Sequence, residues 1–273
     1  MFHVHGLRYI LLSLILAPGC VSAQSLVVAS FWSTPTVSIY EDLVAQMHCA
    51  AGMEIQFQRF PIVRAREEAD AGRVDAGLLH HSANIPDQTH LLPLREPLPP
   101  LQLVYVALRS FPELELNNKT AKSYRVGHFP GLEVAADSWW SPESMAVNGA
   151  YRQLYSLLMA RRIDVALVGY WEAPLFLKEH RELRRVGHTV VSLPVHHYVN
   201  EKHRELRPLL EQKLKELKAN PGTTELIEKA KSRHLAGSTN ASGASRQIDC
   251  REFQPPAMTP AAPVPPLVRE QNP

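Results

Sequence analysis

The chain has 273 residues, of which 45% are hydrophobic and 21% are charged, and its 29 basic and 27 acidic side chains give a net charge of +2. This composition is typical of folded proteins and argues against a mainly disordered chain. The near-neutral net charge gives no indication of binding to nucleic acid. The mean hydropathy of −0.17 and the three cysteines argue against a multi-span membrane protein, a disulfide-rich scaffold and a cysteine-rich zinc site.

The first 23 residues have the layout of a secretory signal peptide. Arg8 carries a positive charge, residues 9–17 form an apolar run, and residues 21–23 place small side chains before a cleavage site. We expect cleavage after Ala23, a periplasmic mature chain and no stable membrane span. The alternatives are an uncleaved N-terminal anchor and lipidation at Cys20.

Two cysteines, Cys49 and Cys250, remain after this cleavage. An even pair in an oxidising compartment predicts a disulfide, with two free thiols as the alternative. Such a bond would tie an early helix to a late segment, and closing so long a loop stabilises a fold by about 5 kcal/mol at most.

The hydrophobic pattern predicts two α/β regions. In the first, we expect strands at 25–30, 53–60, 74–79 and 101–108, with helices at 37–51 and 61–71. In the second, we expect strands at 123–128, 164–169 and 189–193 and helices at 149–161 and 175–180, followed by amphipathic helices at 204–219 and 223–234. Alternating strands and helices indicate parallel sheets covered by helices. Residues 251–273 are rich in proline, and we expect them to form a disordered tail.

Two helix-to-strand turns have similar sequences. Gly72-Arg-Val-Asp75 and Arg161-Arg-Ile-Asp164 both connect a predicted helix to a predicted strand. This similarity suggests two lobes of similar construction.

Four stretches together resemble the bacterial extracellular solute-binding proteins of the amino-acid-transporter type (family 3). They are Phe60–Ala65 with the Gly72–Ala76 turn, Leu94–Leu108, Arg161–Ala166 with Tyr170–Pro174, and His203–Ala230, and the resemblance covers about residues 25–233.

The resemblance implies a two-lobe, type 2 periplasmic-binding-protein fold of the α/β class, in which each lobe is a mostly parallel sheet flanked by helices. Lobe 1 would comprise residues 24–108 and 194–250, lobe 2 would comprise residues 109–193, and the chain would cross near Leu108–Pro112 and Val190–Pro194. Such a protein captures a small polar ligand, amino-acid-like or amine-bearing, in a cleft between its lobes. It passes the ligand to an ABC-type membrane transporter, or it serves as a sensory or partner-binding protein of the same fold.

Ligands of open α/β sheets bind at the carboxyl ends of the strands. This rule selects several side chains as candidate ligand contacts, namely Phe31, Trp32, His80, His128, Tyr170, Trp171 and Glu172. The aromatic members can stack on a ligand, and they can equally belong to the lobe cores.

Glu172 occupies the position, two residues before Pro174, at which family members carry an acidic partner for an α-amino group. The arginine that binds a ligand carboxylate in the family has no counterpart at residues 88–90. Arg95 and Arg64 are the candidates to replace it, because arginine binds carboxylates through two hydrogen bonds. A cationic or amine-bearing ligand therefore fits this sequence better than a standard amino acid.

We expect no metal site, no cofactor and no enzymatic activity. The 13 histidines include no HExxH motif, no Cys/His ligand spacing is present, and no nucleophile elbow or phosphate-binding loop occurs. An enzyme resembling cyclohexadienyl dehydratase, with Glu172 and His128 as an acid–base pair, is the less favoured alternative.

Overall fold

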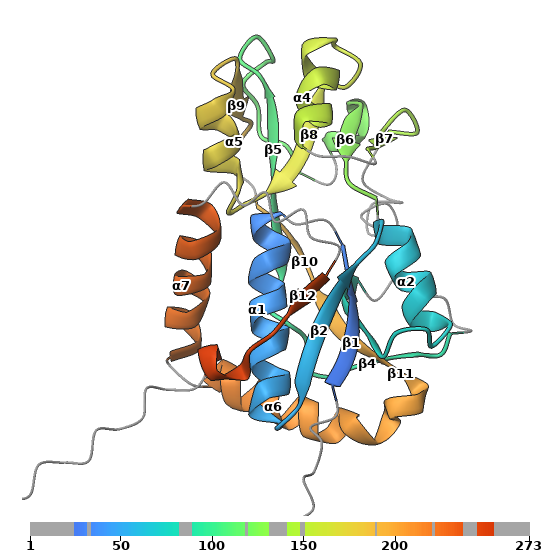
Figure 1. The fold of residues 1–273 in the computed structure, drawn as a ribbon. Coiled ribbons are helices and arrows are strands. Elements are labelled where there is room, and N and C mark those ends of the chain that lie inside the picture. The colour runs from blue at the N-terminus through green and yellow to red at the C-terminus, as the bar shows by residue number, and fades with distance from the viewer. Residues whose placement is uncertain are drawn as a thin grey trace, which may run out of the picture.

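The protein consists of two α/β lobes, each built around one sheet (Figure 1). The structure, a computed structural model, describes residues 25–31, 34–81, 89–117, 120–130, 141–147, 151–188, 190–219, 222–236 and 245–253. The expected signal peptide and residues 254–273 lie outside this part of the chain. Within the described residues, no helix is both long and apolar enough to cross a bilayer.

Lobe 1 contains a six-stranded sheet in the order β12-β2-β1-β3-β11-β4. Its strands are β1 (Ser25–Ser30), β2 (Glu54–Arg59), β3 (Ala76–His81), β4 (Leu91–Pro93), β11 (Val195–Asn200) and β12 (Ser245–Gln247). Its helices are α1 (Pro35–Ala50), α2 (Ile62–Asp70), α6 (Arg207–Ala219) and α7 (Gly222–Ala236). Because α1 and α2 connect parallel strands in opposite directions across the sheet, right-handed crossovers place them on opposite faces.

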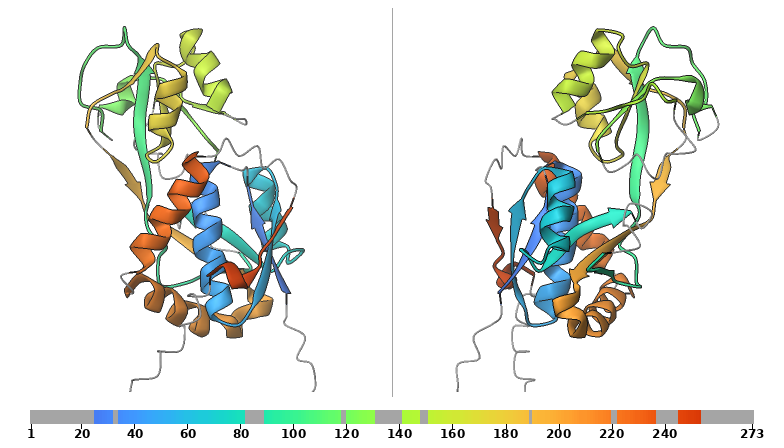
Figure 2. Two further views of the ribbon diagram at one scale, coloured as in Figure 1. Left: turned by 60° about the vertical axis from the view of Figure 1, so that its left-hand side comes forward. Right: turned by 90° about the vertical axis from the view of Figure 1, so that its right-hand side faces the viewer.

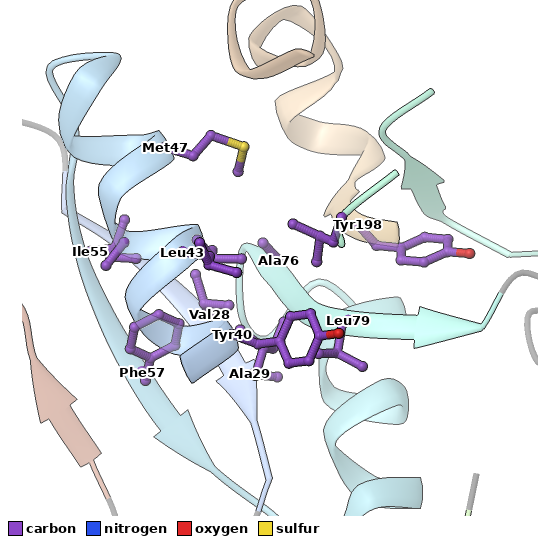
Figure 3. Packing of buried hydrophobic residues seen from close by; sticks show 14 of the residues in the cluster. Val28, Ala29, Tyr40, Leu43, Met47, Ile55, Phe57, Ala76, Leu79 and Tyr198 are labelled. Carbon is purple, nitrogen blue, oxygen red and sulfur yellow. The ribbon is translucent and has the colours of Figure 1, made fainter. Parts of the chain in front are cut away.

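Helix α1 is buried over nearly its whole length, from Thr36 to His48. It packs on β2 and β3, α7 runs beside it, and α6 contacts its end farther from lobe 2 (Figure 2). Leu43 and Met47 of α1 meet Val28 and Ile55 of the sheet in the core (Figure 3). The helix is therefore the centre of lobe 1, and its N-terminus points toward lobe 2.

Lobe 2 contains a sheet in the order β10-β5-β8-β6-β7, with β9 also paired to β5. Its strands are β5 (Leu101–Leu108), β6 (Val126–His128), β7 (Met145–Ala146), β8 (Val165–Gly169), β9 (Leu183–Arg185) and β10 (Val191–Leu193). Helices α4 (Tyr151–Met159) and α5 (Ala173–Glu179) pack in the upper lobe of Figure 1. The expected two-lobe α/β architecture is confirmed.

The two sheets are mixed, whereas we expected them to be mostly parallel. Among the described strands, parallel pairing joins β1 to β2 and β3 in lobe 1, and β6 to β7 and β8 in lobe 2. The strands β5 and β11 enter their sheets directly from a crossing between the lobes and run antiparallel to their neighbours. A strand that enters a sheet from the other lobe needs no crossover helix, so it is free to run in the opposite direction.

The two connections between the lobes lie side by side. Leu101 of β5 pairs antiparallel with Leu193 of β10, and the amide of Leu98 donates to the carbonyl of Val195 at 3.0 Å. We expected the first crossing after Leu108, but β5 already belongs to the sheet of lobe 2, so the chain crosses before Leu101. The second crossing lies at 193–195 and overlaps the expected segment, residues 190–194.

The two similar turns have the same geometry. The carboxylate of Asp75 accepts from the amide of Val27 at 2.8 Å and that of Asp164 from the amide of Arg125 at 2.8 Å. In each turn the amide of the aspartate also donates back to the carbonyl of the same partner. Each aspartate therefore joins the start of its strand to the neighbouring parallel strand, which confirms the similar construction of the lobes.

The folded part of the C-terminal segment extends to residue 253, whereas we expected a disordered tail from residue 251. Cys250 forms the predicted disulfide with Cys49 of α1, with a Cα–Cα distance of 5.3 Å, and starts a 3₁₀ helix, Cys250–Phe253. Arg246 of β12 pairs with the buried carboxylates of Glu41 and Asp42 at 3.2 and 2.6 Å. The disulfide and these ion pairs fix β12 on the edge of β2, so residues 251–253 belong to the fold rather than to a disordered tail.

Candidate functional site

A cavity of about 340 Å³ lies between the lobes. The N-terminal end of α1, helix α2 and the end of β3 form its wall in lobe 1, and β5, the loop after β6 and the end of β8 form its wall in lobe 2. Leu101, Leu193 and Val195, from the two crossing segments, also line it. The wall of the cavity therefore comes from both lobes and from the connections between them.

Glu172 is buried in the wall of this cavity, with 3% of its surface exposed, and it is the residue that precedes α5. Its Oε1 accepts a hydrogen bond from the backbone amide of Thr36 at 2.7 Å, and its Oε2 accepts one from the hydroxyl of Tyr151. Thr36 lies in the first turn of α1, where amides have no partner within the helix and a negative charge is stabilised. Glu172 of lobe 2 thus caps a helix of lobe 1.

The position of Glu172 depends on a small residue at the end of β8. A methyl group on Gly169 would lie 2.9 Å from Oγ1 of Thr36 and would overlap the Glu172 carboxylate. Glycine therefore leaves the space through which the carboxylate reaches the first turn of α1.

Burial controls the protonation of this carboxylate and its partner. Burial raises the pKa of Glu172, and the hydrogen bonds from Tyr151 and Thr36 oppose that rise. Burial and the nearby carboxylate raise the pKa of Tyr151, so its hydroxyl keeps its proton and remains a donor. Sequence reasoning did not select Tyr151, and the only available signal was its place at the start of a predicted helix.

Trp171 and Tyr170 are not among the residues that line the cavity. The Trp171 ring packs against the core of lobe 1, with its centroid 6.2 Å from that of Tyr40, and Lys231 of α7 lies 4.9 Å from the Trp171 centroid. Tyr170 is 40% exposed, and its ring centroid lies 5.9 Å from the Arg185 guanidinium. Trp171 therefore joins Glu172 in bridging the lobes, although neither Trp171 nor Tyr170 lines the cavity.

His80 lines the cavity, and His128 does not. Burial and, to a smaller extent, the charges of Arg66 and His197 lower the pKa of His80 to about 4, so its ring is neutral at pH 7. His128 is buried, with its Nδ1 3.0 Å from the carbonyl oxygen of Phe129. The structure therefore does not bring Glu172 and His128 together in the cavity as an acid–base pair.

Arg64 and Arg95 lie outside the cavity. The Arg64 side chain is 64% exposed and pairs with Glu68 at 3.2 Å, and Arg95 is exposed on the surface of lobe 1. The arginine that lines the cavity is Arg66, which sequence reasoning missed. Helical periodicity could have found it, because Arg66 lies on the stripe of α2 that contains the buried residues Ala65 and Ala69.

Phe31 lines the cavity at the end of β1, as its place at the carboxyl end of a strand predicts. Its neighbour Trp32 lies outside the described residues. Among the described side chains, no group of three or more His, Cys, Asp and Glu residues is arranged to hold a metal ion.

Comparisons with known family models and with curated protein sequences find no match. Solved structures, in contrast, are similar over most of this chain. A histidine kinase sensor domain with similarity to periplasmic binding proteins matches with a TM-score of 0.61 and 16% identity, covering 78% of this chain and 96% of its own. The chain has the fold of periplasmic binding proteins.

Two further structures show the same fold. An ancestral arginine-binding protein bound to arginine has a TM-score of 0.58 and 17% identity, covering 75% of this chain and 97% of its own. The substrate-binding protein of an amino acid ABC transporter has a TM-score of 0.57 and 15% identity, covering 78% of this chain and all of its own. At these identities the similarity establishes the fold, and the function has to be argued from the site.

Proposed function

We propose that this protein is a solute-binding protein that captures a small molecule in the cavity between its lobes. The observation that carries the proposal is the origin of the cavity wall, which comes from both lobes and from the two crossing segments. A ligand in this position contacts residues of both lobes, so binding stabilises their closed arrangement. The cavity volume of about 340 Å³ lies within the range typical of small-molecule sites, roughly 300–1,000 Å³.

The paired crossing segments are suited to act as a hinge. Leu101 and Leu193 lie opposite each other on paired strands of one sheet, and Val195 begins a strand of the other sheet. A rotation near residues 193–195 and in the segment before Leu101 would open the cavity and leave each sheet intact. The contacts made by Trp171 and Glu172 with lobe 1 would have to break during this opening.

The proposed location is the periplasm. The proposed partner is a membrane transporter or a membrane sensor that recognises the closed, ligand-bound arrangement of the two lobes. The layout of residues 1–23 supports export, and the fold supports ligand-dependent closure. Both partners would use the same capture step, so this step is tested first.

A thermal-shift screen of the purified protein tests the capture. The panel contains amino acids, polyamines, quaternary amines, organic acids and short peptides. A ligand at 100 times its dissociation constant adds about 2.7 kcal/mol to the free energy of unfolding, which gives a clear rise in Tm. We expect at least one hit, and we expect it to be lost in Ile62→Trp, because Ile62 is half-buried on the cavity wall and an indole there fills the space.

Met159→Trp is the matched control, because Met159 is exposed on α4 and lies outside the cavity. It should respond to the hit as the unmodified protein does. A hit that persists in Ile62→Trp would place binding elsewhere and contradict the proposal.

A further inference from the structure

The inference concerns His80 and rests on the proposed function. His80 lies near the carboxyl end of β3 in the wall of the cavity, and 9% of its surface is exposed. Its ring packs against that of Tyr198, with the centroids 5.6 Å apart. Within the part of the chain that the structure describes, neither ring nitrogen of His80 has a hydrogen-bond partner. A polar ring is therefore buried here without the hydrogen bonds that usually accompany burial.

Two other histidines of the same sheet are held by backbone carbonyls. Nδ1 of His196 lies 2.8 Å from the carbonyl oxygen of Leu94, and Nδ1 of His197 lies 3.0 Å from that of Leu78. Such a bond fixes which ring nitrogen carries the proton. No bond of this kind fixes the proton of His80 among the described residues, so its neutral ring can present an N–H donor on the nitrogen that a ligand reaches.

The strand makes room for the His80 ring without bonding to it. A methyl group on Gly77 would lie only 3.2 Å from Nε2 of His80, so glycine leaves the space that the ring occupies. Burial of a polar group without a partner costs free energy relative to an apolar side chain of the same size. Filling this space alone would therefore be done better by an aliphatic residue.

The charge around His80 favours an oxygen atom as its partner. Burial and, to a smaller extent, the charges of Arg66 and His197 lower its pKa to about 4, so the ring is neutral at pH 7. The positive charge of Arg66 opposes a cationic group beside the ring for the same reason that it opposes a second proton on it. A hydroxyl or carbonyl oxygen carries partial negative charge and accepts from an N–H donor.

Aliphatic and aromatic side chains from both lobes form much of the rest of the wall. They include Phe31, Leu79, Leu101, Leu103, Leu193 and Val195. Transfer of apolar surface from water to such an environment is favourable. An apolar body beside the group that pairs with His80 therefore fits this wall.

We propose that His80 is the hydrogen-bond donor that anchors a hydroxyl or amide oxygen of the ligand, while an apolar part of the ligand packs against the aliphatic and aromatic side chains of the two lobes.

Isothermal titration with three compounds of one skeleton tests this proposal. Ethylbenzene, 2-phenylethanol and phenylacetamide share a phenyl ring and a two-carbon chain, and the last two carry an oxygen at its end. We expect 2-phenylethanol and phenylacetamide to bind about tenfold or more tightly than ethylbenzene, which corresponds to one buried hydrogen bond.

Substitution of His80 assigns the contact. In His80→Leu, the affinities for the three compounds should lie within about threefold of one another, and ethylbenzene should bind within about threefold of its affinity for the unmodified protein. His80→Gln keeps a donor and should retain part of the preference for oxygen. The matched control is His90→Leu, because the His90 side chain is 64% exposed and lies outside the cavity. This control should bind all three compounds as the unmodified protein does.

The stability of His80→Leu separates a ligand contact from a structural role. Leucine has about the volume of histidine, and the substitution breaks no hydrogen bond among the described residues. The Tm of this variant without ligand should therefore lie within about 3 °C of that of the unmodified protein. A larger fall would show that the fold itself uses the imidazole and would contradict the proposal.

The outcomes distinguish this proposal from the capture function. A preference for oxygen that persists in His80→Leu, or that is lost equally in His90→Leu, would overturn the contact with His80 and leave capture standing. The same holds if none of the three compounds binds while the broader screen gives a hit. A protein that binds none of the three compounds and no member of the screen would contradict both proposals.

Discussion

Glu172 shows how far a single residue can be understood from sequence alone. Its place two residues before Pro174 led us to expect a contact with a ligand, and the structure places Glu172 in the wall of the cavity. Its partners were not predictable, because the amide of Thr36 lies 136 positions away and belongs to the other lobe. The free energy of a buried carboxylate depends on such partners, so its role as a helix cap between lobes emerges only from the fold.

Removing this cap should destabilise the protein. Glu172→Ala leaves the amide of Thr36 and the hydroxyl of Tyr151 without their acceptor, and we expect a loss of about 2–3 kcal/mol in the free energy of unfolding, measured with urea. Glu172→Gln keeps one acceptor oxygen and should lose about 1 kcal/mol. Glu179→Ala is the matched control, because Glu179 is exposed at the end of α5 and should change stability by less than about 0.5 kcal/mol. Equal stability of Glu172→Ala and the control would contradict the role of Glu172 as a cap.

Three buried histidines make stability dependent on pH. His48 and His197 lie in the core of lobe 1 with their Nε2 atoms 3.2 Å apart, and His80 lies in the cavity wall. Burial lowers the pKa of His80 and of His197 to about 4, and burial followed by the charge of His197 lowers that of His48. The unfolded chain keeps a histidine pKa near 6.5, so between about pH 4 and 6.5 it binds more protons than the folded protein does.

The free energy of unfolding should therefore fall as the pH falls through this window. From pH 7.5 to pH 5, we expect a loss of about 2–4 kcal/mol from His80 and His197, with His48 adding to it. The raised pKa of Glu172 has the opposite sign and offsets part of this loss. Urea unfolding at the two pH values measures the change, and His197→Gln should reduce it. A free energy of unfolding that is the same at both pH values would show that these rings do not titrate as their burial implies.

Most elements of the fold follow from the sequence pattern, and the exceptions have physical causes. The helices α1, α2, α4, α5, α6 and α7 and the strands β1, β2, β3, β5, β6, β8 and β10 lie within a few residues of their predicted positions. Strand β11 was missed because His196, His197 and Asn200 interrupt its apolar pattern, and His197 and Asn200 are buried through hydrogen bonds formed with distant parts of lobe 1. Strands β4, β7, β9 and β12 have two or three residues each, too few for a periodicity to show.

The two similar turns after α2 and α4 differ in the residue that adopts a left-handed backbone conformation. Gly72 adopts a φ of +70° and Arg161 a φ of +54°, so the same left-handed position is filled by glycine in one lobe and by arginine in the other. The left-handed conformation costs a residue with a Cβ roughly 1–2 kcal/mol, whereas glycine adopts it freely.

Exchange of these residues should shift stability in opposite directions. Arg161→Gly should raise the free energy of unfolding by about 0.5–1 kcal/mol, because part of the gain is lost to the greater freedom of glycine in the unfolded chain. Gly72→Ala should lower it by about 1 kcal/mol, since a methyl group there would make ordinary contacts, no closer than 3.6 Å, with Asn200 and the cost is conformational. Thermal unfolding of both variants measures the shifts, and a destabilised Arg161→Gly would contradict the equivalence of the turns.

At the scale of the whole molecule, the cavity is lined by both lobes and by the paired crossing segments that connect them. The cap formed by Glu172 and the packing of Trp171 hold the lobes together on one side, and the crossing segments join them beside the cavity. A ligand in the cavity would add contacts to both lobes at once. Capture between the lobes is therefore the central claim of this account.

Hydrogen–deuterium exchange with and without the best ligand of the screen tests this claim most directly. We predict slower exchange in both lobes together, at the first turns of α1 around residues 36–40 in lobe 1 and at residues 169–172 in lobe 2, with little change at the exposed end of α5. Slower exchange confined to one lobe, or located away from these two segments, would contradict capture between the lobes.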